Sequence, residues 1–339
     1  ALQFRFLDSS PQAPGAQVAP IVVGAFDDIR ALRELAGQVD LVTYEFENVP
    51  VAALQEMAAT RPCFPPVDAL RVSQDRILEK ELFSHLGIPT PPYRAVDSRA
   101  DLDAAVAALG LPCVLKTRRL GYDGRGQRVL KKRADVGPAW EALGGVPLIL
   151  EGFVAFEHEV SIIGARSTRG EVRAYPLATN THREGILRVT VAPTRNARLQ
   201  RAAEGYLRRV IDHFGYAGVL TIEFFVAGGR LVANEMAPRV HNSGHWTIEG
   251  AVTSQFENHL RAIMGLPLGE TRAVGHCAMV NFIGAMPDQD RVLALPGAHH
   301  HDYGKAPRPG RKLGHCTIVA RTAAERDRTL RRLLRLVPR

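Results

Sequence analysis

The sequence predicts a protein of mixed α/β and α+β class, with an N-terminal parallel α/β domain, a larger central domain and a small C-terminal β-rich domain. Strand-like and helix-like segments alternate near the start, which is typical of parallel strands joined by crossover helices. Further along, two apolar runs flank the turn AGGR and indicate an antiparallel hairpin. A length of 339 residues is enough for two or three domains. We place them at residues 1–70, 71–265 and 266–339.

The first predicted domain consists of short strands and helices in alternation. The strands are residues 2–7, 21–23 and 41–46, and the helices are residues 27–36 and 51–59. The following segment CFPP breaks the pattern, because proline has no N–H for a ladder or a helix. We therefore expect the first boundary near residue 70.

The central domain opens with a helix over residues 75–86, which Gly87 and Pro89 end. A strand at 112–116 runs into a glycine-rich loop, and further strands follow at 146–151, 160–165 and 172–177. Apolar residues recur on one face of a helix that runs up to Phe214. The C-terminal domain is expected to hold short strands, a loop rich in His, Pro and Gly, and an Arg-rich terminal helix.

Composition excludes several classes of protein. Hydrophobic residues make up 46% and charged residues 23%, as in an ordinary globular chain. No run approaches the roughly 18 apolar residues that a membrane span needs, and the N-terminus lacks the pattern of a signal peptide. Four cysteines, at positions 63, 113, 277 and 316, have neither zinc-ligand nor redox spacing. We therefore expect reduced thiols, a cytoplasmic location and no membrane partner.

The net charge of +8 is concentrated at the C-terminal end. Residues 305–339 hold eleven Lys or Arg and two acidic residues, so the rest of the chain sums to about −1. Such a local basic tail suits a site for anionic small molecules or a solvated helix as well as it suits nucleic acid. No helix-turn-helix, zinc finger or aromatic RNA-binding motif accompanies it, so we expect no nucleic-acid partner.

Two acidic residues stand inside the apolar strands of the hairpin. With a loop at residues 228–230, Glu223 lies directly opposite Glu235, and opposed residues share a face of the sheet. Carboxylates so close repel unless a cation or a proton lies between them, and hard oxygen ligands are what Mg²⁺ requires. Asn234 points to the other face of an ideal strand and joins such a site only through a bulge or a strand end. The alternative is an edge hairpin with both acids in water.

The loop GYDGRGQ, residues 121–127, carries three glycines whose backbone N–H groups can curl around phosphate oxygens. Arg125 adds charge, and Tyr122 and Asp123 add polar reach. Lys116 ends the preceding strand, where its ammonium can meet a phosphate. No Walker sequence follows, and taken alone the loop is better explained as a flexible surface turn.

Two further segments are rich in hydrogen-bond donors. RVHNSGHW, residues 239–246, follows the hairpin and suits anion binding, while the loop-forming residues between its two His argue against a metal pair. GKAPRPGRKLGH, residues 304–315, forms a stiff basic loop of the kind that phosphate groups bind. The alternatives are a hydrogen-bonded turn with a buried Trp and a solvated basic turn. The triple His at 299–301 resembles a metal tract, but neighbours in a strand point to different faces.

In this order, the segments resemble those of the N5-carboxyaminoimidazole ribonucleotide synthetases, a family of ATP-grasp enzymes in purine biosynthesis. The matching strings are YEFENVP, QDR before a helix, LKTRRLGYDGRGQ, EGFVAFEHEVSIIGAR, YPLATNTHREGILR, IEFF with NEMAPRVHNSGHWT, and RPGRKLGH. GYDGRGQ, NEMAPRVHNSGHW and RPGRKLGH together are specific to this family within its superfamily. The resemblance implies an ATP-grasp fold, with ATP between the two sheets of the central module, a pre-ATP-grasp N-terminal domain and a small C-terminal domain.

For the nucleotide, the resemblance implies a site built from strands of both sheets and from the glycine-rich loop, which acts as a lid. The residues implied to bind it are Arg76, Lys116, Gly121, Tyr122, Gly124, Gly126, Gln127, Glu151, Phe153, Val154, Glu159, His182, Asn234 and Glu235. Arg76 and Lys116 are assigned to the phosphates and Glu159 to the ribose. Glu223 and Glu235 are assigned to Mg²⁺, with Mn²⁺ as an alternative ion.

For the second half of the reaction, the resemblance implies bicarbonate and aminoimidazole ribonucleotide as substrates. The residues implied to be catalytic are Asp123, Arg125, Arg239 and His241. The residues implied to bind these substrates are Tyr122, Asp123, Asn242, Ser243, Lys305, Arg311 and Lys312. The last three take the 5′-phosphate, and one of Glu45 and Glu47 also touches the ribonucleotide, a choice that the sequence leaves open.

The implied reaction starts with attack of bicarbonate on the γ-phosphorus of ATP, which gives carboxyphosphate and ADP. Arg239 and His241 orient the bicarbonate, and Asp123 positions or deprotonates the amine that then takes the carboxyl carbon, directly or as released CO₂. The family opens with a strand and a glycine-rich turn that are absent before residue 1 here, so we expect the parallel sheet to lack its first strand. The resemblance also implies a homodimer.

Two alternatives to this function remain open at this point. One is another ATP-grasp ligase that joins a different carboxylate and amine, which substrate-dependent ADP release with a panel of acids and amines discriminates. The other is a catalytically silent protein that binds nucleotides or, through its basic tail, nucleic acid. It predicts salt-sensitive binding without ATP turnover.

Overall fold

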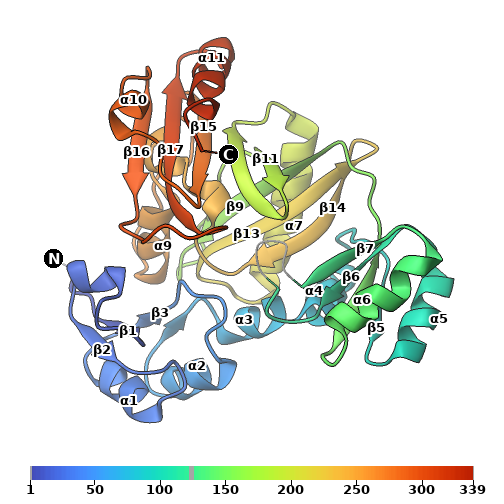
Figure 1. Ribbon diagram of the computed structural model, residues 1–339. Helices are drawn as coiled ribbons and strands as arrows, with labels where there is room; N and C mark the ends of the chain where they lie inside the picture. Colours follow the sequence, from blue (N-terminus) through green and yellow to red (C-terminus); the bar gives the residue numbers. More distant parts are fainter. Residues whose placement is uncertain (1, 122–125, 339) are drawn as a thin grey trace.

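The fold is described from a computed structural model, in which residues 2–121 and 126–338 are described (Figure 1). The N-terminal body contains two pairs of short parallel strands covered by helices. The pairs are β1 (Phe6–Asp8) with β2 (Ile21–Val23), and β3 (Val42–Thr43) with β4 (Cys63–Phe64). The helices are α1 (Ile29–Gly37), α2 (Val51–Ala58) and a 3₁₀ turn, η1 (Pro14–Gln17).

The N-terminal strands differ from the single parallel sheet that we predicted. No ladder joins the two pairs within the described residues, so they form two sheets of two strands each. The predicted strand over residues 41–46 shortens to β3, because the chain leaves the sheet after Thr43. The side chain of Gln74 then holds the departing segment through the carbonyls of Glu47 and Val49, each at 2.8 Å. This turns Glu45 and Glu47 away from the N-terminal core.

Two helices lead into a four-stranded sheet in the order β5-β8-β6-β7. The helices are α3 (Val67–Ser73) and α4 (Arg76–His85), and the strands are β5 (Tyr93–Val96), β6 (Cys113–Thr117), β7 (Gln127–Leu130) and β8 (Leu148–Gly152). One side of this sheet is covered by α5 (Arg99–Leu109), the 3₁₀ turn η2 (Arg133–Asp135) and α6 (Val136–Leu143). Asp75 caps α4 by accepting from the N–H of Ile77 at 3.0 Å, as expected for a helix that starts after an aspartate.

The largest sheet has nine strands and runs through the centre of the molecule into its C-terminal part. Its order is β14-β13-β9-β11-β12-β15-β17-β16, with β10 paired to β9. The strands are β9 (His158–Arg166), β10 (Val172–Ala174), β11 (Ala178–Arg183), β12 (Ile186–Ala192), β13 (Gly218–Ala227), β14 (Arg230–Ala237), β15 (His276–Ile283), β16 (Ala298–Asp302) and β17 (Lys312–Ala320). The C-terminal strands therefore extend the central sheet through the β12–β15 pairing.

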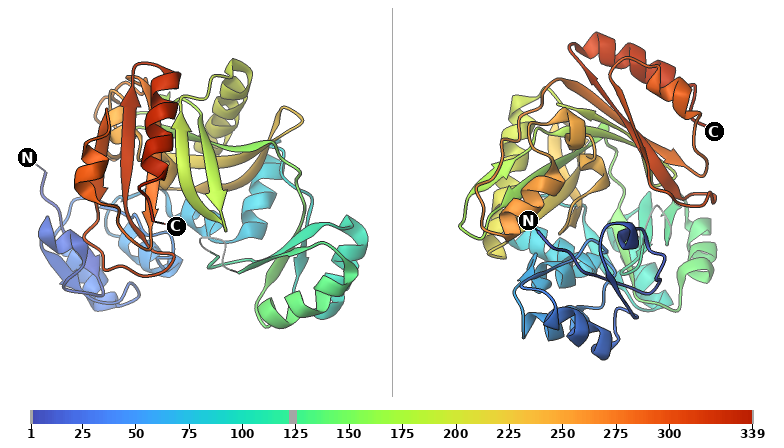
Figure 2. Two further views of the ribbon diagram at one scale, coloured as in Figure 1. Left: turned by 45° about the horizontal axis from the view of Figure 1, so that its top comes forward. Right: turned by 90° about the vertical axis from the view of Figure 1, so that its left-hand side faces the viewer.

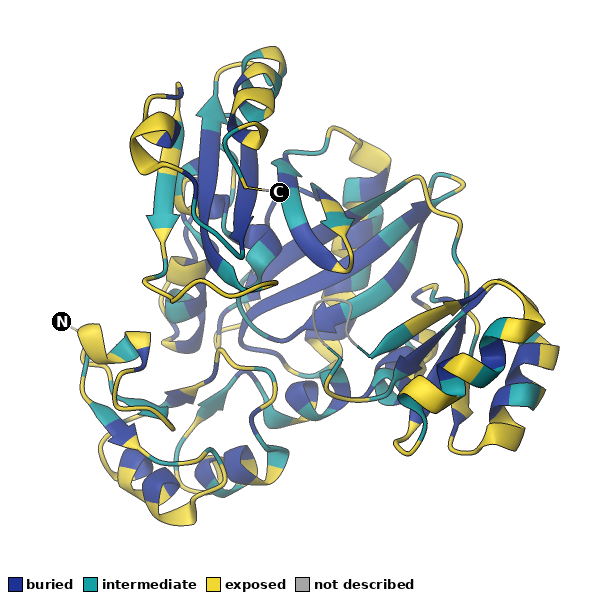
Figure 3. Ribbon diagram, viewed as in Figure 1, coloured by how far each residue is buried: buried dark blue, intermediate teal, exposed yellow. Residues whose placement is uncertain are grey.

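The helices that follow β12 cover parts of this sheet. They are α7 (Ala197–His213), the 3₁₀ turn η3 (Asn242–Gly244), α8 (Thr247–Gly250), α9 (Gln255–Ile263), α10 (Gln289–Leu293) and α11 (Ala323–Leu334). α7 buries Leu199, Ala203, Leu207 and Val210 against β9 and β13, and each fully buried leucine or valine side chain stabilises the fold by about 1.5–3 kcal/mol. Figure 3 shows the resulting pattern, with buried strands inside and helices exposed on their outer faces.

The β13–β14 hairpin differs from our prediction in its turn and agrees in its pairing. The turn has two residues, Gly228 and Gly229, at φ +55° and +66°, instead of the predicted three. An unbroken ladder from this turn would pair Glu223 with Asn234. A bulge after Phe224 and Ala233 adds one residue on β14, so Glu223 pairs with Glu235 after all. The bulge that Asn234 required is therefore present.

Figures 1 and 2 show the four-stranded sheet to one side of the nine-stranded sheet, and in Figure 1 the N-terminal body lies beneath the C-terminal strands. The segment between β16 and β17 descends from the C-terminal strands toward the N-terminal body. Within the described residues, no helix combines the length and apolar character required to cross a bilayer.

Candidate active site

A cavity of about 700 Å³ lies between the four-stranded sheet and the nine-stranded sheet. Its walls come from β6, β7 and β8 on one side, from β11, β13 and β14 on the other, and from α4 and residues 45–48. The predicted site residues that line it are Arg76, Lys116, Gly121, Gln127, Glu151, Phe153, Val154, Glu159, His182, Glu223, Asn234, Glu235, Arg239, His241, Asn242 and Lys312. Tyr122, Asp123, Gly124 and Arg125 lie outside the described residues.

Glu223 and Glu235 both line this cavity from paired positions on β13 and β14. Burial raises the pKa of Glu223 to about 7, against the lowering effect of His182. Burial also favours the protonated form of Glu235, but Arg76 and Lys116 lower its pKa below the ordinary value. Beside them, the buried Oδ1 atom of Asn234 has no hydrogen-bond partner. Two carboxylates and an orphaned amide oxygen are hard donors that fit a cation such as Mg²⁺, with phosphate oxygens or water completing its shell.

No group of three or more His, Cys, Asp or Glu in the described part of the chain is arranged to hold a metal ion by itself. This applies to the His triple too, because His301 and His300 point to different neighbours. His301 binds Glu249 at 2.7 Å and stacks on His315, whereas the ring of His300 lies against Phe282.

Part of the cavity wall is a set of charged side chains in which cations and anions alternate. The ammonium of Lys116 lies 2.9 Å from Glu151, and the guanidinium of Arg76 lies 3.1 Å from Glu235. Burial works against the charged form of Glu151, but Lys80 and Lys116 bring its pKa down to about 2. These carboxylates hold the cations in place, and the phosphate groups of a bound polyphosphate would compete with the carboxylates for the same cations.

Sequence reasoning missed Lys80 and Glu79, which hold the bulged strand. The ammonium of Lys80, fully buried, donates to the carbonyl of Asn234 at 2.5 Å and lies 3.9 Å from Glu151. Glu79 accepts from the N–H of Met236 at 2.6 Å. β14 is an edge strand, so these side chains of α4 satisfy backbone groups that no further strand can pair. The sequence did hold a signal for them: both are charged residues at positions of α4 that helical spacing assigns to its buried face, where charged side chains are rare unless they are paired.

Another part of the cavity wall, which we call the apolar end, is apolar and aromatic and suits contact with a flat ring such as a purine base. Phe153 and Val154 line it on the segment after β8, and Phe156 stacks on Phe225 with ring centroids 4.7 Å apart. Phe156 and Phe225 were not predicted, although an aromatic residue so close to Phe153 and Val154 in the sequence was a visible signal.

Next to this apolar end, Glu159 binds Nδ1 of His182 at 2.7 Å. Burial alone lowers the pKa of a histidine, but the hydrogen bond to Glu159 makes the pKa of His182 higher than usual.

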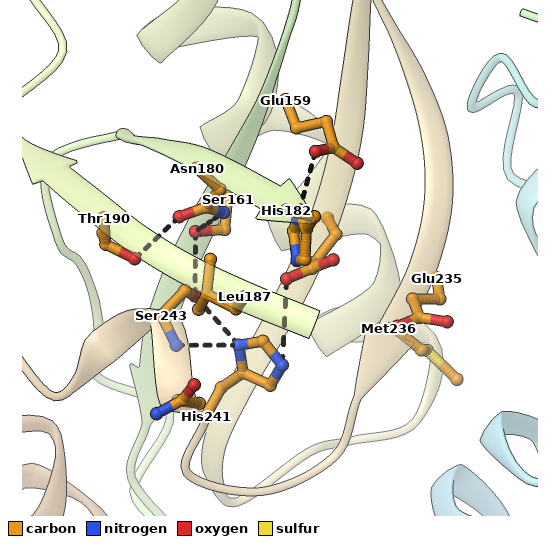
Figure 4. A network of polar contacts seen from close by, with 12 residues as sticks. Glu159, Ser161, Asn180, His182, Leu187, Thr190, Glu235, Met236, His241 and Ser243 are labelled. Carbon is orange, nitrogen blue, oxygen red and sulfur yellow. Dashed lines mark hydrogen bonds and ion pairs between the residues drawn. The ribbon is translucent and has the colours of Figure 1, made fainter. Parts of the chain in front are cut away.

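His241 is held at the cavity by a chain of buried polar groups (Figure 4). Its Nδ1 lies 2.8 Å from the hydroxyl of Ser243, and its Nε2 lies 3.8 Å from Glu223. Burial, together with the charge of Arg239, lowers the pKa of His241 well below its ordinary value, so the imidazole is neutral at neutral pH. Ser243, predicted to touch substrate, is fully buried behind His241 and is not part of the cavity wall. Its hydroxyl is turned toward Ser161 and His241 because both offer hydrogen bonds in the interior.

Arg239, which we assigned to bicarbonate, is bound to Glu47 from the N-terminal body. Its Nη2 and Nε donate to the same carboxylate oxygen at 2.6 and 3.1 Å. Burial raises the pKa of Glu47 from its ordinary value although Arg239 opposes this. Burial and the charge of Arg311 lower the pKa of Lys305, and the charge of Glu45 opposes this in part. The two acids that the sequence could not separate therefore face different partners.

A second cavity of about 1330 Å³ adjoins the first and shares Glu45, Arg239, Asn242 and Lys312 with it. It lies between the N-terminal body and the segment before β17. Lys305, Arg311 and Lys312, predicted to take a phosphate, all line it. The basic loop thus lies next to the first cavity.

Gly126 follows the four undescribed residues of the glycine-rich loop, for which the resemblance implies the role of a lid, and it does not line the first cavity. It has φ +72°, and a Cβ there would lie 2.7 Å from the hydroxyl of Thr117. A residue other than glycine would therefore strain the backbone and displace β6. Gly121 and Gln127, which also flank the lid, do line the cavity.

Comparison with known families defines the class of protein. Residues 81–256 match the ATP-grasp domain, residues 1–74 match the ribonucleotide synthetase preATP-grasp domain, and residues 277–329 match the phosphoribosylaminoimidazole carboxylase C-terminal domain. Together with a cavity between two sheets, these matches define an ATP-dependent ligase of the ATP-grasp class.

The relatives narrow this class to one family. An N5-carboxyaminoimidazole ribonucleotide synthase of Pseudomonas aeruginosa is 54% identical over 317 residues, which cover 94% of this chain and 88% of the relative. The crystal structure of the N5-carboxyaminoimidazole ribonucleotide synthetase from Thermus thermophilus superimposes with a TM-score of 0.95 at 51% identity, covering 100% of this chain and 93% of the other. The chain belongs to the N5-carboxyaminoimidazole ribonucleotide synthase family.

A third relative has been solved with ligands. The crystal structure of N5-carboxyaminoimidazole synthase from Aspergillus clavatus, in complex with ADP and 5-aminoimidazole ribonucleotide, matches with a TM-score of 0.91 at 32% identity. The match covers 99% of this chain and 91% of that one.

Proposed function

We propose that this chain catalyses the ATP-dependent carboxylation of 5-aminoimidazole ribonucleotide by bicarbonate in purine biosynthesis. The products are N5-carboxyaminoimidazole ribonucleotide, ADP and phosphate. One observation carries the proposal: a single cavity holds the paired Glu223 and Glu235, the cations Arg76 and Lys116, and His241, and it shares lining residues with a basic second cavity. The relatives of the same family, one of them complexed with ADP and 5-aminoimidazole ribonucleotide, support the choice of substrates.

Mg²⁺ is proposed as the companion of the nucleotide. Glu223, Glu235 and Asn234 would hold it, because their oxygens face one cavity or lie buried without a partner. When bound, the ion would neutralise negative charge on the phosphates. The cations of the protein would act on the same phosphates: Lys116 and Arg76 line the cavity and would stabilise the charge that develops on the γ-phosphoryl group.

The reaction needs an activated carboxyl group, since bicarbonate is a poor electrophile. We infer that a bicarbonate oxygen attacks the γ-phosphorus as the bond to ADP breaks, which forms carboxyphosphate. Arg239 would bind the anion by charge, and neutral His241 would donate from Nε2 to one of its oxygens. The exocyclic amine of the ribonucleotide then attacks the carboxyl carbon, the amine loses a proton, and phosphate leaves. Asp123 is proposed to position or deprotonate that amine.

The basic second cavity would hold the ribonucleotide by its 5′-phosphate. Lys305, Arg311 and Lys312 supply the charge, and Tyr303 lies 5.2 Å beneath the ammonium of Lys305 in a cation–π contact. Lys312 lines both cavities, so the phosphate would be anchored at their junction.

The experiment that tests the proposal is an ADP-release assay with ATP, Mg²⁺, bicarbonate and 5-aminoimidazole ribonucleotide, with each omitted in turn. We expect full turnover only when all four are present. Equal ADP release with a different carboxylate or amine would contradict the proposed substrates. ATP binding without turnover under all of these conditions would contradict a ligase of any kind.

Two expectations from the sequence also stand as proposals. We infer a cytoplasmic location from the four free cysteines, which form no disulfide. A homodimer is inferred from the family resemblance, and light scattering after size-exclusion chromatography measures it directly.

A further inference from the structure

Four buried polar side chains form a line across the nine-stranded sheet that ends at His241 (Figure 4). They are Thr190 on β12, Asn180 on β11, Ser161 on β9 and Ser243 in η3, and none exposes more than 4% of its surface. Burying a hydroxyl or an amide costs free energy unless it is hydrogen-bonded. Valine or alanine at these strand positions would fill the same interior without that cost. The line therefore needs an explanation beyond the packing of the sheet.

The hydrogen bonds along this line all run in one direction. Thr190 donates to Oδ1 of Asn180 at 3.0 Å, and Nδ2 of Asn180 donates to Oγ of Ser161 at 3.0 Å. The hydroxyl of Ser161 then donates to Oγ of Ser243 at 2.9 Å. Because Ser243 already accepts from Ser161, its own proton is free for the acceptor at 2.8 Å, which is Nδ1 of His241.

A second contact fixes the same end of the imidazole as an acceptor. The backbone N–H of Ser243 also points at Nδ1 of His241, at 3.3 Å. An N–H donor cannot face a protonated Nδ1, so both contacts require the lone pair of Nδ1. In a neutral imidazole the proton must then be on Nε2. Nε2 lies 3.8 Å from Glu223, beyond hydrogen-bond reach, so its N–H stays available to a ligand in the cavity.

We propose that Thr190, Asn180, Ser161 and Ser243 form a one-way hydrogen-bond relay that locks His241 as the Nε2–H tautomer, a neutral donor aimed at the bicarbonate. The relay residues are positioning residues, because they reach the substrate only through His241. The identity of the anion as bicarbonate rests on the proposed function, whereas the tautomer of His241 does not depend on it. It also gives Ser243 a role other than the substrate contact that its sequence position indicated.

A neutral donor has a chemical advantage over a charged one at this place. An imidazolium would give up its proton to bicarbonate or carboxyphosphate and add a cation beside Arg239. The Nε2–H of a neutral ring can stabilise the oxyanion that develops on the carboxyl group without donating its proton away.

The direct test is the tautomer of His241 in the whole chain without substrates. Long-range ¹H–¹⁵N correlation spectra of the ¹⁵N-histidine-labelled protein separate the two tautomers and the imidazolium, and the spectrum of a His241→Gln variant identifies the signal. We expect a protonated Nε2 and an unprotonated Nδ1 from pH 6 to 9. An Nδ1–H tautomer, or an imidazolium at pH 7, would overturn the relay even if the enzyme is active.

The kinetic test uses Ser161→Ala, which removes the relay one step behind Ser243. The matched control is Ser167→Ala, because Ser167 is equally buried, at 1% exposure, and its hydroxyl accepts only from the nearby N–H of Glu171. Removing an oxyanion donor outright costs about 10²–10³ in kcat, and Ser161 acts indirectly, so we expect about a tenfold loss in kcat/KM for bicarbonate with the KM for ATP unchanged. Equal values for the two variants would contradict the relay. Absence of bicarbonate-dependent turnover in the unchanged chain would instead contradict the proposed function.

Discussion

Replacing Glu235 with glutamine separates the role of the carboxylate in the site from its role in stability. Glutamine keeps the shape of the side chain and removes its charge, so Arg76 loses its ion-pair partner at 3.1 Å. The Arg76 side chain is 18% exposed and that of Glu235 is 41% exposed. Breaking a fully buried pair costs about 3–5 kcal/mol, and an exposed pair contributes about 0–1 kcal/mol. The exposure of this pair places it near the range for exposed pairs, so we expect the free energy of unfolding to fall by about 1 kcal/mol.

The effect on turnover is expected to be much larger than the effect on stability. Removal of one preorganised charge that acts on the transferring phosphoryl group costs about 10²–10³ in kcat, or about 2.7–4 kcal/mol. A stability loss of about 1 kcal/mol shifts Tm by only about 2–4 °C in a chain of this size. The variant should therefore stay folded at 25 °C and lose nearly all activity.

The assay is ADP release at saturating Mg²⁺ and substrates, alongside thermal unfolding of the same preparation. Glu56→Gln is the matched control, because the Arg33–Glu56 pair has a similar distance of 3.0 Å and lies on the surface of the N-terminal body. That control should match the unchanged chain in both measurements. Normal kcat in the Glu235→Gln variant would refute our assignment of the phosphate and metal site.

Four further predictions follow from the same cavity. Because burial raises the pKa of Glu223 to about 7, the apparent Mg²⁺ affinity in turnover should fall about tenfold for each pH unit below 7, where a proton occupies the carboxylate. A Glu223→Gln variant should lack this dependence on pH. An Mg²⁺ affinity that does not change with pH in the unchanged chain would contradict the metal assignment. Lys80→Met should raise the KM for ATP about tenfold or more and lower the urea midpoint of unfolding, because the variant leaves buried Glu151 with fewer cations beside it. An unchanged KM for ATP and an unchanged urea midpoint would show that the ammonium of Lys80 is dispensable. Glu47→Gln should raise the KM for bicarbonate about tenfold without changing the KM for ATP, because charge-assisted hydrogen bonds of about 1.5–3 kcal/mol from Glu47 hold the guanidinium of Arg239. A rise in the KM for ATP alone would contradict this. Lys312→Ala should raise the KM for the ribonucleotide and weaken the dependence of this KM on salt concentration. A KM equal to that of the unchanged chain would show that the 5′-phosphate does not bind at Lys312.

The parts of the fold that local patterns decide could be predicted from the sequence. The helix α4 starts where Asp75 offers a cap and ends before Gly87. β9 covers the strand predicted over residues 160–165, and β10 covers the first three residues of the strand predicted over 172–177. The helix predicted to run up to Phe214 is α7, which has one buried apolar face. In each case the signal lies within one or two turns or one hairpin of the chain, so no long-range contact is needed to read it.

The pairing of the two acids was predicted correctly from a turn that was wrong. The sequence favoured a three-residue loop, whereas the chain turns at Gly228 and Gly229 and inserts Asn234 as a bulge. A bulge is stabilised by contacts from outside the hairpin, here the side chains of α4 that bind residues 234–236. Parity counting within the hairpin cannot contain that information, because α4 lies about 150 residues earlier in the chain.

The depth of a side chain was the other property that the sequence did not reveal. In RVHNSGHW, all the donors looked equivalent, yet His241 faces the cavity and Ser243 lies buried behind it. The difference depends on Ser161, 82 residues away in the sequence, which offers Ser243 a partner in the interior. In the same way, the choice between Glu45 and Glu47 depends on Arg239, which only the folded chain brings to Glu47.

The most direct measurement of the proposed chemistry is the fate of the oxygen atoms of bicarbonate. With ¹⁸O-labelled bicarbonate, ATP and 5-aminoimidazole ribonucleotide, the released phosphate should carry one labelled oxygen per turnover, detected by mass spectrometry or by the isotope shift in ³¹P spectra. Label transfer is required if a bicarbonate oxygen attacks the γ-phosphorus between the acidic pair and the cations. Unlabelled phosphate at a normal rate of product formation would contradict a carboxyphosphate route through this site.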